Sequence, residues 1–228
     1  MAVPDAKRQL SGGFVQHRLL AACVLLCAAF AHADDRPSYV VYLAGPEVFL
    51  PNAREAGEDK KRLIERLNAS ENWPFKLVGL YPLDNEIPDF APDRETGIRI
   101  YRANIAMMDR AHAVVANMVR FRGPGMDGGT AFEMGYMRGL GKPVFAYYDA
   151  EPFYGEAEPA GLYPDRVRRL VGQRPDNAAV DVDGLLIEDF GMADNLMMIG
   201  ALDDSRVTLQ ASFEQALMRV AEHVARKR

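Results

Sequence analysis

Short apolar runs alternate with longer amphipathic stretches along most of the chain. Four apolar runs predict buried β-strands at residues 39–45, 76–82, 113–118 and 142–148. Charged stretches with apolar residues at helical spacing predict helices at residues 54–69, 94–111, 130–140 and 209–225. Strands that alternate with helices predict an α/β fold, in which helices cover both faces of a mostly parallel sheet.

Residues 149–194 fit this alternation poorly. Four prolines and several glycine and aspartate residues interrupt the pattern there. One segment within it, residues 182–191 (VDGLLIEDFG), is compatible with a short additional strand, which would make the sheet five-stranded. So long an irregular stretch is typical of a lid or a mobile insert.

The first 33 residues differ from the rest. Lys7, Arg8 and Arg18 precede an apolar run at residues 19–31, which has the length of a signal-peptide core and is too short to span a bilayer. The following Ala-His-Ala fits the small-residue rule for cleavage. We therefore expect a signal peptide at residues 1–33, a periplasmic or secreted protein, and no stable membrane anchor after cleavage. The alternatives are an uncleaved anchor, or an extension that is not a working leader and leaves the protein cytoplasmic.

Composition narrows the possible functions. Hydrophobic residues make up 49% and charged residues 26%, which is ordinary for a globular protein. The net charge is −5 and there is no block of Lys and Arg, so a nucleic-acid polymer is not expected as a partner. Both cysteines, Cys23 and Cys27, lie in the expected leader, which leaves the remaining chain without a thiol nucleophile or a cysteine metal site.

Other familiar chemistries find no support. The four histidines are too scattered for a metal cluster or an evident Ser-His arrangement. The glycine-rich segment 123–129 (GPGMDGG) is not followed by Gly-Lys-Ser/Thr, so it is no phosphate loop. Carboxylate chemistry remains, and neither a metal nor a cofactor is expected.

The position of a site follows from the expected sheet. Ligands of open parallel sheets bind beyond the carboxyl ends of the strands, where the strand order reverses. In a flavodoxin-like order the reversal lies between the first and third strands, whose following loops are residues 45–49 and 119–129. If this order holds, one cleft receives Tyr42, Phe49, Asp127 and Glu133.

The stretch 125–135 (GMDGGTAFEMG) has two interpretations. Thr130 and Glu133 have the spacing of a capping box, in which Glu133 would be structural. Alternatively, Glu133 is a reactive carboxylate beside a glycine turn, with Asp127 nearby. A carboxylate in the first turn of a helix is favoured in its ionised, nucleophilic form. Both can hold if Thr130 caps the helix while Glu133 faces the cleft.

Five segments resemble, in family order, the nucleoside 2-deoxyribosyltransferases. They are VYLAGPEVF (41–49), PLDNE (82–86), GIRIYRANIAMM (97–108), the long run VVANMVRFRGPGMDGGTAFEMGYMRGLGKPVF (114–145) and DNLMM (194–198). The long run is the specific match, and the resemblance indicates a domain of this family at residues 38–228. It implies a flavodoxin-like fold with a five-stranded sheet and cleavage of the N-glycosidic bond of 2′-deoxynucleosides.

The resemblance also implies the reacting groups. Glu133 matches the family nucleophile, which attacks the anomeric carbon and forms a glycosyl ester. A second base or water then attacks, so that two displacements retain the anomeric configuration. Tyr42 matches the tyrosine that positions this nucleophile.

Further matches concern the substrate. Asp127 matches the acid that holds the sugar hydroxyls, and Gly129 lets the backbone approach the sugar. Gly45 and Phe49 match the loop that cradles the base. The last segment implies a homo-oligomer, with Asn195 reaching a neighbouring site and Met197 packing beside the nucleophile.

One position departs from many members of the family. Where they carry an aspartate that donates a proton to the leaving base, this chain has Asn104. An amide can hydrogen-bond a base but cannot deliver a proton as an acid does. Asp84, Asn85 and Glu86 are nearby candidates by family position, and the base preference stays open.

Three functions are compatible with these residues. The first is a transferase that moves deoxyribose from a deoxynucleoside to a free nucleobase. The second is a hydrolase that acts on deoxynucleosides or their 5′-monophosphates, although Asp127 would repel a 5′-phosphate. The third is a secreted nucleoside-binding or effector domain without turnover.

Overall fold

The computed structural model describes residues 34–154, 161–176, 179–202 and 212–227. The chain divides into two units, Met1–Asp35 and Arg36–Arg228, and the fold below is that of the second. The expected leader, residues 1–33, lies outside the described residues. Among the described residues, no helix has both the length and the apolar character needed to cross a membrane.

Four parallel strands form the sheet in the order β2-β1-β3-β4. Their bounds are β1 Ser38–Ala44, β2 Lys76–Leu80, β3 Ala113–Asn117 and β4 Val144–Tyr147. The strand order reverses between β1 and β3, which confirms the α/β fold and the flavodoxin-like order. The predicted count of five strands is wrong for the part of the chain that the structure describes.

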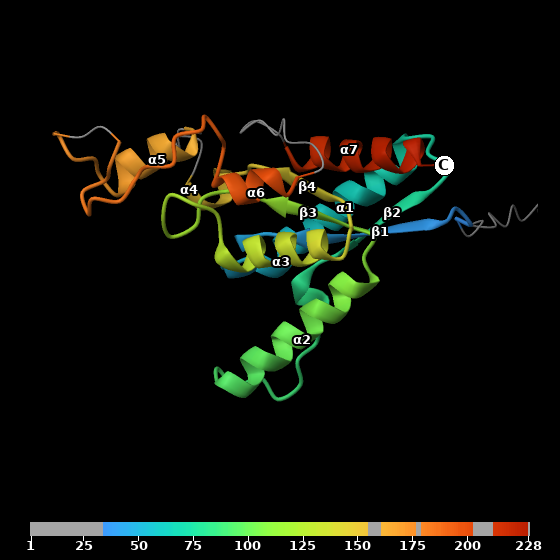
Figure 1. The fold of residues 1–228 in the computed structure, drawn as a ribbon. Coiled ribbons are helices and arrows are strands. Elements are labelled where there is room, and N and C mark those ends of the chain that lie inside the picture. Colours follow the sequence, from blue (N-terminus) through green and yellow to red (C-terminus); the bar gives the residue numbers. More distant parts are fainter. Residues whose placement is uncertain (1–33, 155–160, 177–178, 203–211, 228) are drawn as a thin grey trace, which may run out of the picture. The chain divides into compact units, whose positions relative to one another are not determined.

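Helices cover both faces of this sheet because successive strand residues point to opposite sides. On one face, Val41 and Leu43 share a core with α1 (Ala53–Ser70) and α7 (Phe213–Arg226). On the other face, Tyr42 and Ala44 share a second core with α2 (Arg94–Arg110), α3 (Gly128–Gly139) and α6 (Leu196–Gly200). Figure 1 shows α3 and α7 on opposite sides of the strands, and α2 running away from the sheet.

Capping side chains set the starts of two helices. Asp93 accepts a hydrogen bond from the Thr96 N–H at 2.8 Å, and α2 begins at the next residue, as predicted. Ser212 and Gln215 form a reciprocal capping box at the start of α7, which begins at Phe213. Residues 209–211 of the predicted helix lie outside the described residues.

The irregular stretch after β4 contains two helices, α4 (Glu151–Tyr154) and α5 (Tyr163–Leu170). The segment predicted as a fifth strand, residues 182–191, forms no strand and contributes only Leu186 to an isolated bridge, with Val180. The Asp181 carboxylate accepts hydrogen bonds from the N–H groups of Asp183 and Leu185, at 3.0 and 2.9 Å. These bonds fold the backbone into a turn and take N–H groups that a strand ladder would need.

Two short 3-10 helices follow strands on the same edge of the sheet. The first, η1 (Pro46–Phe49), follows β1, and the second, η2 (Pro82–Asp84), follows β2. Both therefore lie at the carboxyl edge of the sheet, where a ligand site is expected.

Candidate active site

Glu133 and Tyr42 form a hydrogen-bonded pair on the α2 and α3 face of the sheet. The buried residues Met134 and Met137 fix α3 against this face. The hydroxyl of the buried Tyr42, on β1, donates to Glu133 Oε1 at 2.6 Å. Within the described residues, Glu133 Oε2 accepts no hydrogen bond. One carboxylate oxygen is thus held, and the other is available to react.

The Glu133 carboxyl binds its proton more tightly than an ordinary glutamate. Burial raises its pKa to about 7, the hydrogen bond from Tyr42 opposes this rise, and the nearby Asp127 charge adds to it. The expectation that the helix start would favour the ionised form is therefore wrong in its net effect. Glu133 is the sixth residue of α3, and the field of a helix terminus falls off within the first turn.

The Tyr42 hydroxyl is held protonated by the same arrangement. Burial, followed by the charge and the hydrogen bond of Glu133, raises the pKa of Tyr42 well above its usual value. The hydroxyl therefore remains a hydrogen-bond donor to Glu133 throughout the physiological pH range.

Asp127 caps α3 in place of Thr130. Its Oδ2 accepts hydrogen bonds from the Thr130 N–H at 2.8 Å and from Thr130 Oγ1 at 2.9 Å. A Cβ at Gly129 would come within 3.0 Å of this oxygen, so the residue there must be small for the carboxylate to fold back. The predicted capping box of Thr130 and Glu133 is wrong, and Glu133 is free of any capping role.

The loop after β1 depends on a second buried glutamate, Glu47, to which no role was assigned from the sequence. Glu47 Oε1 accepts hydrogen bonds from Asn117 Nδ2 and the Tyr147 hydroxyl, each at 2.9 Å, and lies 2.6 Å from Lys60 Nζ. A Cβ at Gly45 would lie 2.0 Å from Glu47 Oε2, so only glycine fits there. Gly45 thus serves the packing of this carboxyl group.

Glu47 is charged although it is buried. Burial alone would raise its pKa, but the Lys60 charge and the hydrogen bonds from Lys60 and Asn117 outweigh that effect and lower the pKa. Glu47 and Lys60 also line a cavity of about 590 Å³ between α1, α4 and α7. Glu133, Tyr42 and Asp127 do not line this cavity, so it is separate from the candidate site.

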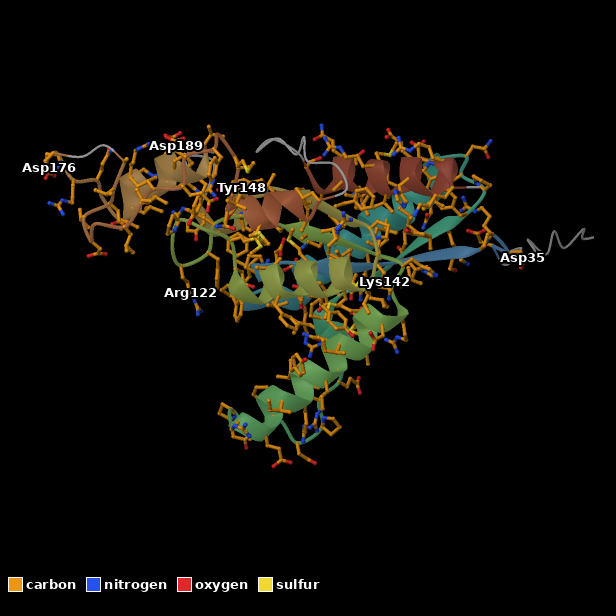
Figure 2. All side chains as sticks on the ribbon, viewed as in Figure 1. Asp35, Arg122, Lys142, Tyr148, Asp176 and Asp189 are labelled. Atoms are coloured by element: carbon orange, nitrogen blue, oxygen red, sulfur yellow. The ribbon has the colours of Figure 1, made fainter. Side chains whose placement is uncertain are left out.

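Phe49 connects the loops that follow β1 and β3. Its ring stacks on Phe121 at a centroid distance of 5.1 Å, and the Arg122 guanidinium lies 5.3 Å from the centre of the Phe49 ring. Phe49 remains 55% exposed. Figure 2 labels Arg122 on this loop, where its side chain points away from the ribbon. The two predicted loops therefore do meet at the edge of the sheet.

The residues after β2 point in two directions. Asn85 Nδ2 donates to Asn104 Oδ1 of α2 at 3.2 Å and to Met107 Sδ at 2.7 Å. Asp84 instead forms an ion pair with Lys61 of α1, and its Oδ2 accepts a hydrogen bond from the Tyr81 N–H at 2.9 Å. The structure thus brings Asn85 to Asn104 and turns Asp84 toward the other helical layer. Within the described chain, no hydrogen bond joins these residues to Glu133 or Tyr42.

Asn195 caps α6. Its Oδ1 accepts from the Met197 N–H at 3.0 Å, and its Nδ2 donates to Glu188 Oε2 at 2.7 Å. Met197 is 69% exposed. No hydrogen bond links Asn195 to Glu133 within the described residues.

The same described residues contain no group of three His, Cys, Asp or Glu side chains that could hold a metal ion.

The chain is similar to known proteins over most of its length. The model of one protein family, described as nucleoside 2-deoxyribosyltransferase, matches residues 41–197, a span that includes every candidate residue named above. An uncharacterized protein of Schizosaccharomyces pombe is 28% identical over 202 residues, which cover 81% of this chain and 88% of that protein. The solved structure of a 2-desoxiribosyltransferase from Leishmania mexicana superposes with a TM-score of 0.55 and 28% identity, covering 81% of this chain and 98% of the other.

Proposed function

This chain belongs to the nucleoside 2-deoxyribosyltransferase family, and from that premise we propose that it transfers the deoxyribosyl group of a 2′-deoxynucleoside to another nucleobase. The observation that carries the proposal is the pair of Tyr42 and Glu133, in which one carboxylate oxygen is held and the other is open. The similarity to the 2-desoxiribosyltransferase from Leishmania mexicana supports the same reaction class.

The reaction proceeds by two displacements at the anomeric carbon. Glu133 Oε2 attacks this carbon, and the carbon–nitrogen bond breaks with its electron pair going to the departing base. The result is a deoxyribosyl ester of Glu133, while Tyr42 keeps its hydrogen bond to Oε1. A nitrogen of the second base then attacks, the ester bond breaks, and the carboxylate is restored. Two inversions give net retention.

Protons balance through the two bases. The departing base gains a proton and the incoming base loses one, so no net proton is consumed. Asn85 and Asn104 form a hydrogen-bonded amide pair that can contact a base but cannot protonate it. We therefore propose that the proton gained by the departing base comes from solvent, or that the base is already protonated when it departs.

Substrate binding is assigned to the two loops at the edge of the sheet. Asp127 Oδ2 is engaged in capping α3, which leaves Oδ1 to accept a hydrogen bond from a sugar hydroxyl. Phe49 stacks on Phe121 and stays 55% exposed, so the exposed part of its ring is suited to contact a base. Gly129 has no side chain, so the backbone at the start of α3 stays accessible to the sugar.

The same proposal includes a homo-oligomer in which Asn195 reaches a neighbouring site. Large apolar side chains between residues 182 and 197 are exposed, among them Leu185, Leu186, Phe190 and Met197. Exposed apolar surface is typical of regions that bind other proteins. The test mixes Asn195→Ala subunits with Glu133→Gln subunits: recovery of turnover supports sharing of sites between subunits, and a monomeric mass in light scattering contradicts it.

We also place the protein outside the cytoplasm, on the basis of residues 1–33. Mass spectrometry of the protein from its native host should find Asp34 as the first residue. A chain that still begins with Met1 contradicts a cleaved leader.

One assay tests the reaction itself. The protein is incubated with deoxyadenosine, with and without cytosine. Deoxycytidine formation supports the transferase. Adenine and free deoxyribose without deoxycytidine would identify a hydrolase, and no change in the nucleoside would favour a binding domain.

A further inference from the structure

A fully buried arginine in α5 ties three separate segments together. The Arg166 side chain is 0% exposed. Its Nε donates to the Pro124 carbonyl, its Nη1 to the Gly161 carbonyl and its Nη2 to the Ala193 carbonyl, each at 2.7 Å. Nη2 also donates to Asp194 Oδ2 at 3.0 Å. A planar guanidinium with several fixed donors is suited to such a junction.

Asp194 completes the junction from the other side. Its side chain is 3% exposed. Oδ2 accepts a second hydrogen bond, from the Met126 N–H at 3.1 Å, and Oδ1 accepts from the Asn195 N–H at 2.8 Å. The backbone at Pro124 and Met126 and the backbone at Ala193 and Asn195 are therefore held by one buried ion pair.

Both held segments run directly into candidate substrate residues. Asp127 follows Met126, and Asn195 follows Asp194. Tyr42 and Glu133, in contrast, stand on β1 and α3, and neither contacts the ion pair through a hydrogen bond within the described residues. The pair is therefore placed to set the position of the substrate groups without touching the reacting carboxylate.

We propose that Arg166 and Asp194 are positioning residues, which hold Asp127 for the deoxyribosyl group bound in the same chain and Asn195 for the site of the neighbouring subunit. This inference rests on the proposed function. It also changes the interpretation of residues 149–194, which the sequence indicated as a lid or mobile insert. The buried Arg166–Asp194 ion pair fastens this part of the chain to the loop after β3 through Pro124 and Met126, so it acts as a brace and not as a closing lid.

The first test compares Arg166→Lys with Arg168→Lys. Lysine keeps the charge at 166 but lacks the fork that reaches four acceptors. Arg168 lies on the same helix, is partly exposed and pairs with Asp165 and Asp189, so it is a matched control. We expect KM for deoxyadenosine to rise roughly tenfold in Arg166→Lys with kcat within about threefold of wild type, because a ground-state contact is weakened. The control should keep the wild-type KM.

A merely structural role predicts another result. Loss of folded enzyme lowers the apparent kcat and leaves KM unchanged, and this outcome would overturn the proposal. The double variant Arg166→Met with Asp194→Leu guards against misfolding, since apolar replacement of a buried ion pair is commonly tolerated. It should show the same rise in KM. A wild-type KM in a folded double variant, or failure of both variants to fold, would also overturn the proposal.

A second readout does not depend on turnover. Hydrogen exchange at the Met126 and Asn195 amides should be at least roughly tenfold faster in Arg166→Lys than in Arg168→Lys, because both amides donate to Asp194. Equal exchange contradicts the brace. Absence of deoxyadenosine turnover in the wild-type protein would instead contradict the proposed function, so the two failures are distinguishable.

Discussion

Two glutamates, the buried Glu47 and the half-buried Glu133, lie near the carboxyl edge of the sheet, on opposite faces. Each accepts a hydrogen bond from a tyrosine on a strand: Glu47 from Tyr147 at 2.9 Å and Glu133 from Tyr42 at 2.6 Å. Glu47 also has Lys60 at 2.6 Å, which together with Asn117 lowers its pKa. Among the residues that the structure describes, none forms an ion pair with Glu133, and burial raises its pKa to about 7.

The difference separates Glu47, a carboxylate held in an ion pair, from Glu133, the carboxylate that we propose as the nucleophile. Glu47 is paired with Lys60 and hydrogen-bonded, so the fold holds it as an anion and its loss would leave Lys60 without this partner. Burial disfavours the anionic form of Glu133, as its raised pKa indicates. In our proposal, formation of the uncharged ester removes this unfavourable charge. A tyrosine partner alone therefore does not mark a nucleophile, because Glu47 has one too. What distinguishes the two carboxylates is the Lys60 cation beside Glu47.

The largest expected effect comes from Glu133→Gln. Glutamine keeps the size of the side chain and can still accept the hydrogen bond from Tyr42, but its amide cannot form the ester. We expect kcat for conversion of deoxyadenosine and cytosine to deoxycytidine to fall by at least about 10³-fold. A variant that retains a tenth of the wild-type rate would exclude Glu133 as the nucleophile.

Glu47→Gln should act on stability. Removing the anion leaves Lys60 buried without its partner, so the free energy of unfolding in urea should fall by about 3 kcal/mol. Glu58→Gln is the control, because Glu58 is an exposed partner of Lys61 and should change stability by less than about 0.5 kcal/mol. Equal effects of the two substitutions would remove the distinction between Glu47 and a surface acid.

Each glutamate accepts a hydrogen bond from a tyrosine hydroxyl, and Tyr42→Phe removes the one to Glu133. Its loss removes a contact to a charged group, so kcat/KM at pH 7 should fall roughly thirtyfold, or about 2 kcal/mol. In the wild type, kcat/KM should rise with pH and reach half its plateau near pH 7, since the ionised Glu133 reacts. Because the Tyr42 bond lowers the pKa of Glu133, the midpoint should move to higher pH in Tyr42→Phe. Tyr147→Phe should leave the midpoint in place.

The smallest expected effect is on the stability of Glu133→Gln. The pKa of Glu133 is about 7 in the folded state and about 4.3 when unfolded, so the folded protein binds more protons between these values. Wild-type stability should therefore fall as pH rises through this window. The two pKa values set an upper limit of about 3.6 kcal/mol. Because solvent screens the half-buried carboxylate, we expect Glu133→Gln to be more stable by about 1–2 kcal/mol at pH 8 in urea unfolding, with no difference near pH 4. A variant that is less stable at pH 8 would contradict the raised pKa.

Much of the fold could be predicted because its signals are local. Alternation on β1, with Val41 and Leu43 on one side and Tyr42 on the other, indicates a strand covered on both faces. The prediction of a fifth strand took the apolar residues Leu185 and Leu186 as buried, and it was wrong because both are exposed. The Asp181 carboxylate takes the N–H groups there, and composition does not reveal such a side-chain turn.

The sequence predicted which residues lie in the candidate site, but it did not predict their pKa values or which residue caps α3. The structure places Tyr42 against Glu133 and Asp127 at the start of α3, while their catalytic and binding roles stay predictions. Asp127 and Thr130 both fit a helix cap, and only the fold selects Asp127. The pKa of Glu133 depends on burial by distant segments, and Glu47 is held by residues from α1, β3 and β4. Neither is visible in a local motif.

The most direct test of the account is a peptide map of the protein after reaction with deoxyadenosine, without acceptor and with an acid quench. We predict one deoxyribosyl group per chain, on the peptide that contains Glu133 and on that residue. A deoxyribosyl group on any other residue would contradict the central claim that Glu133 is the nucleophile.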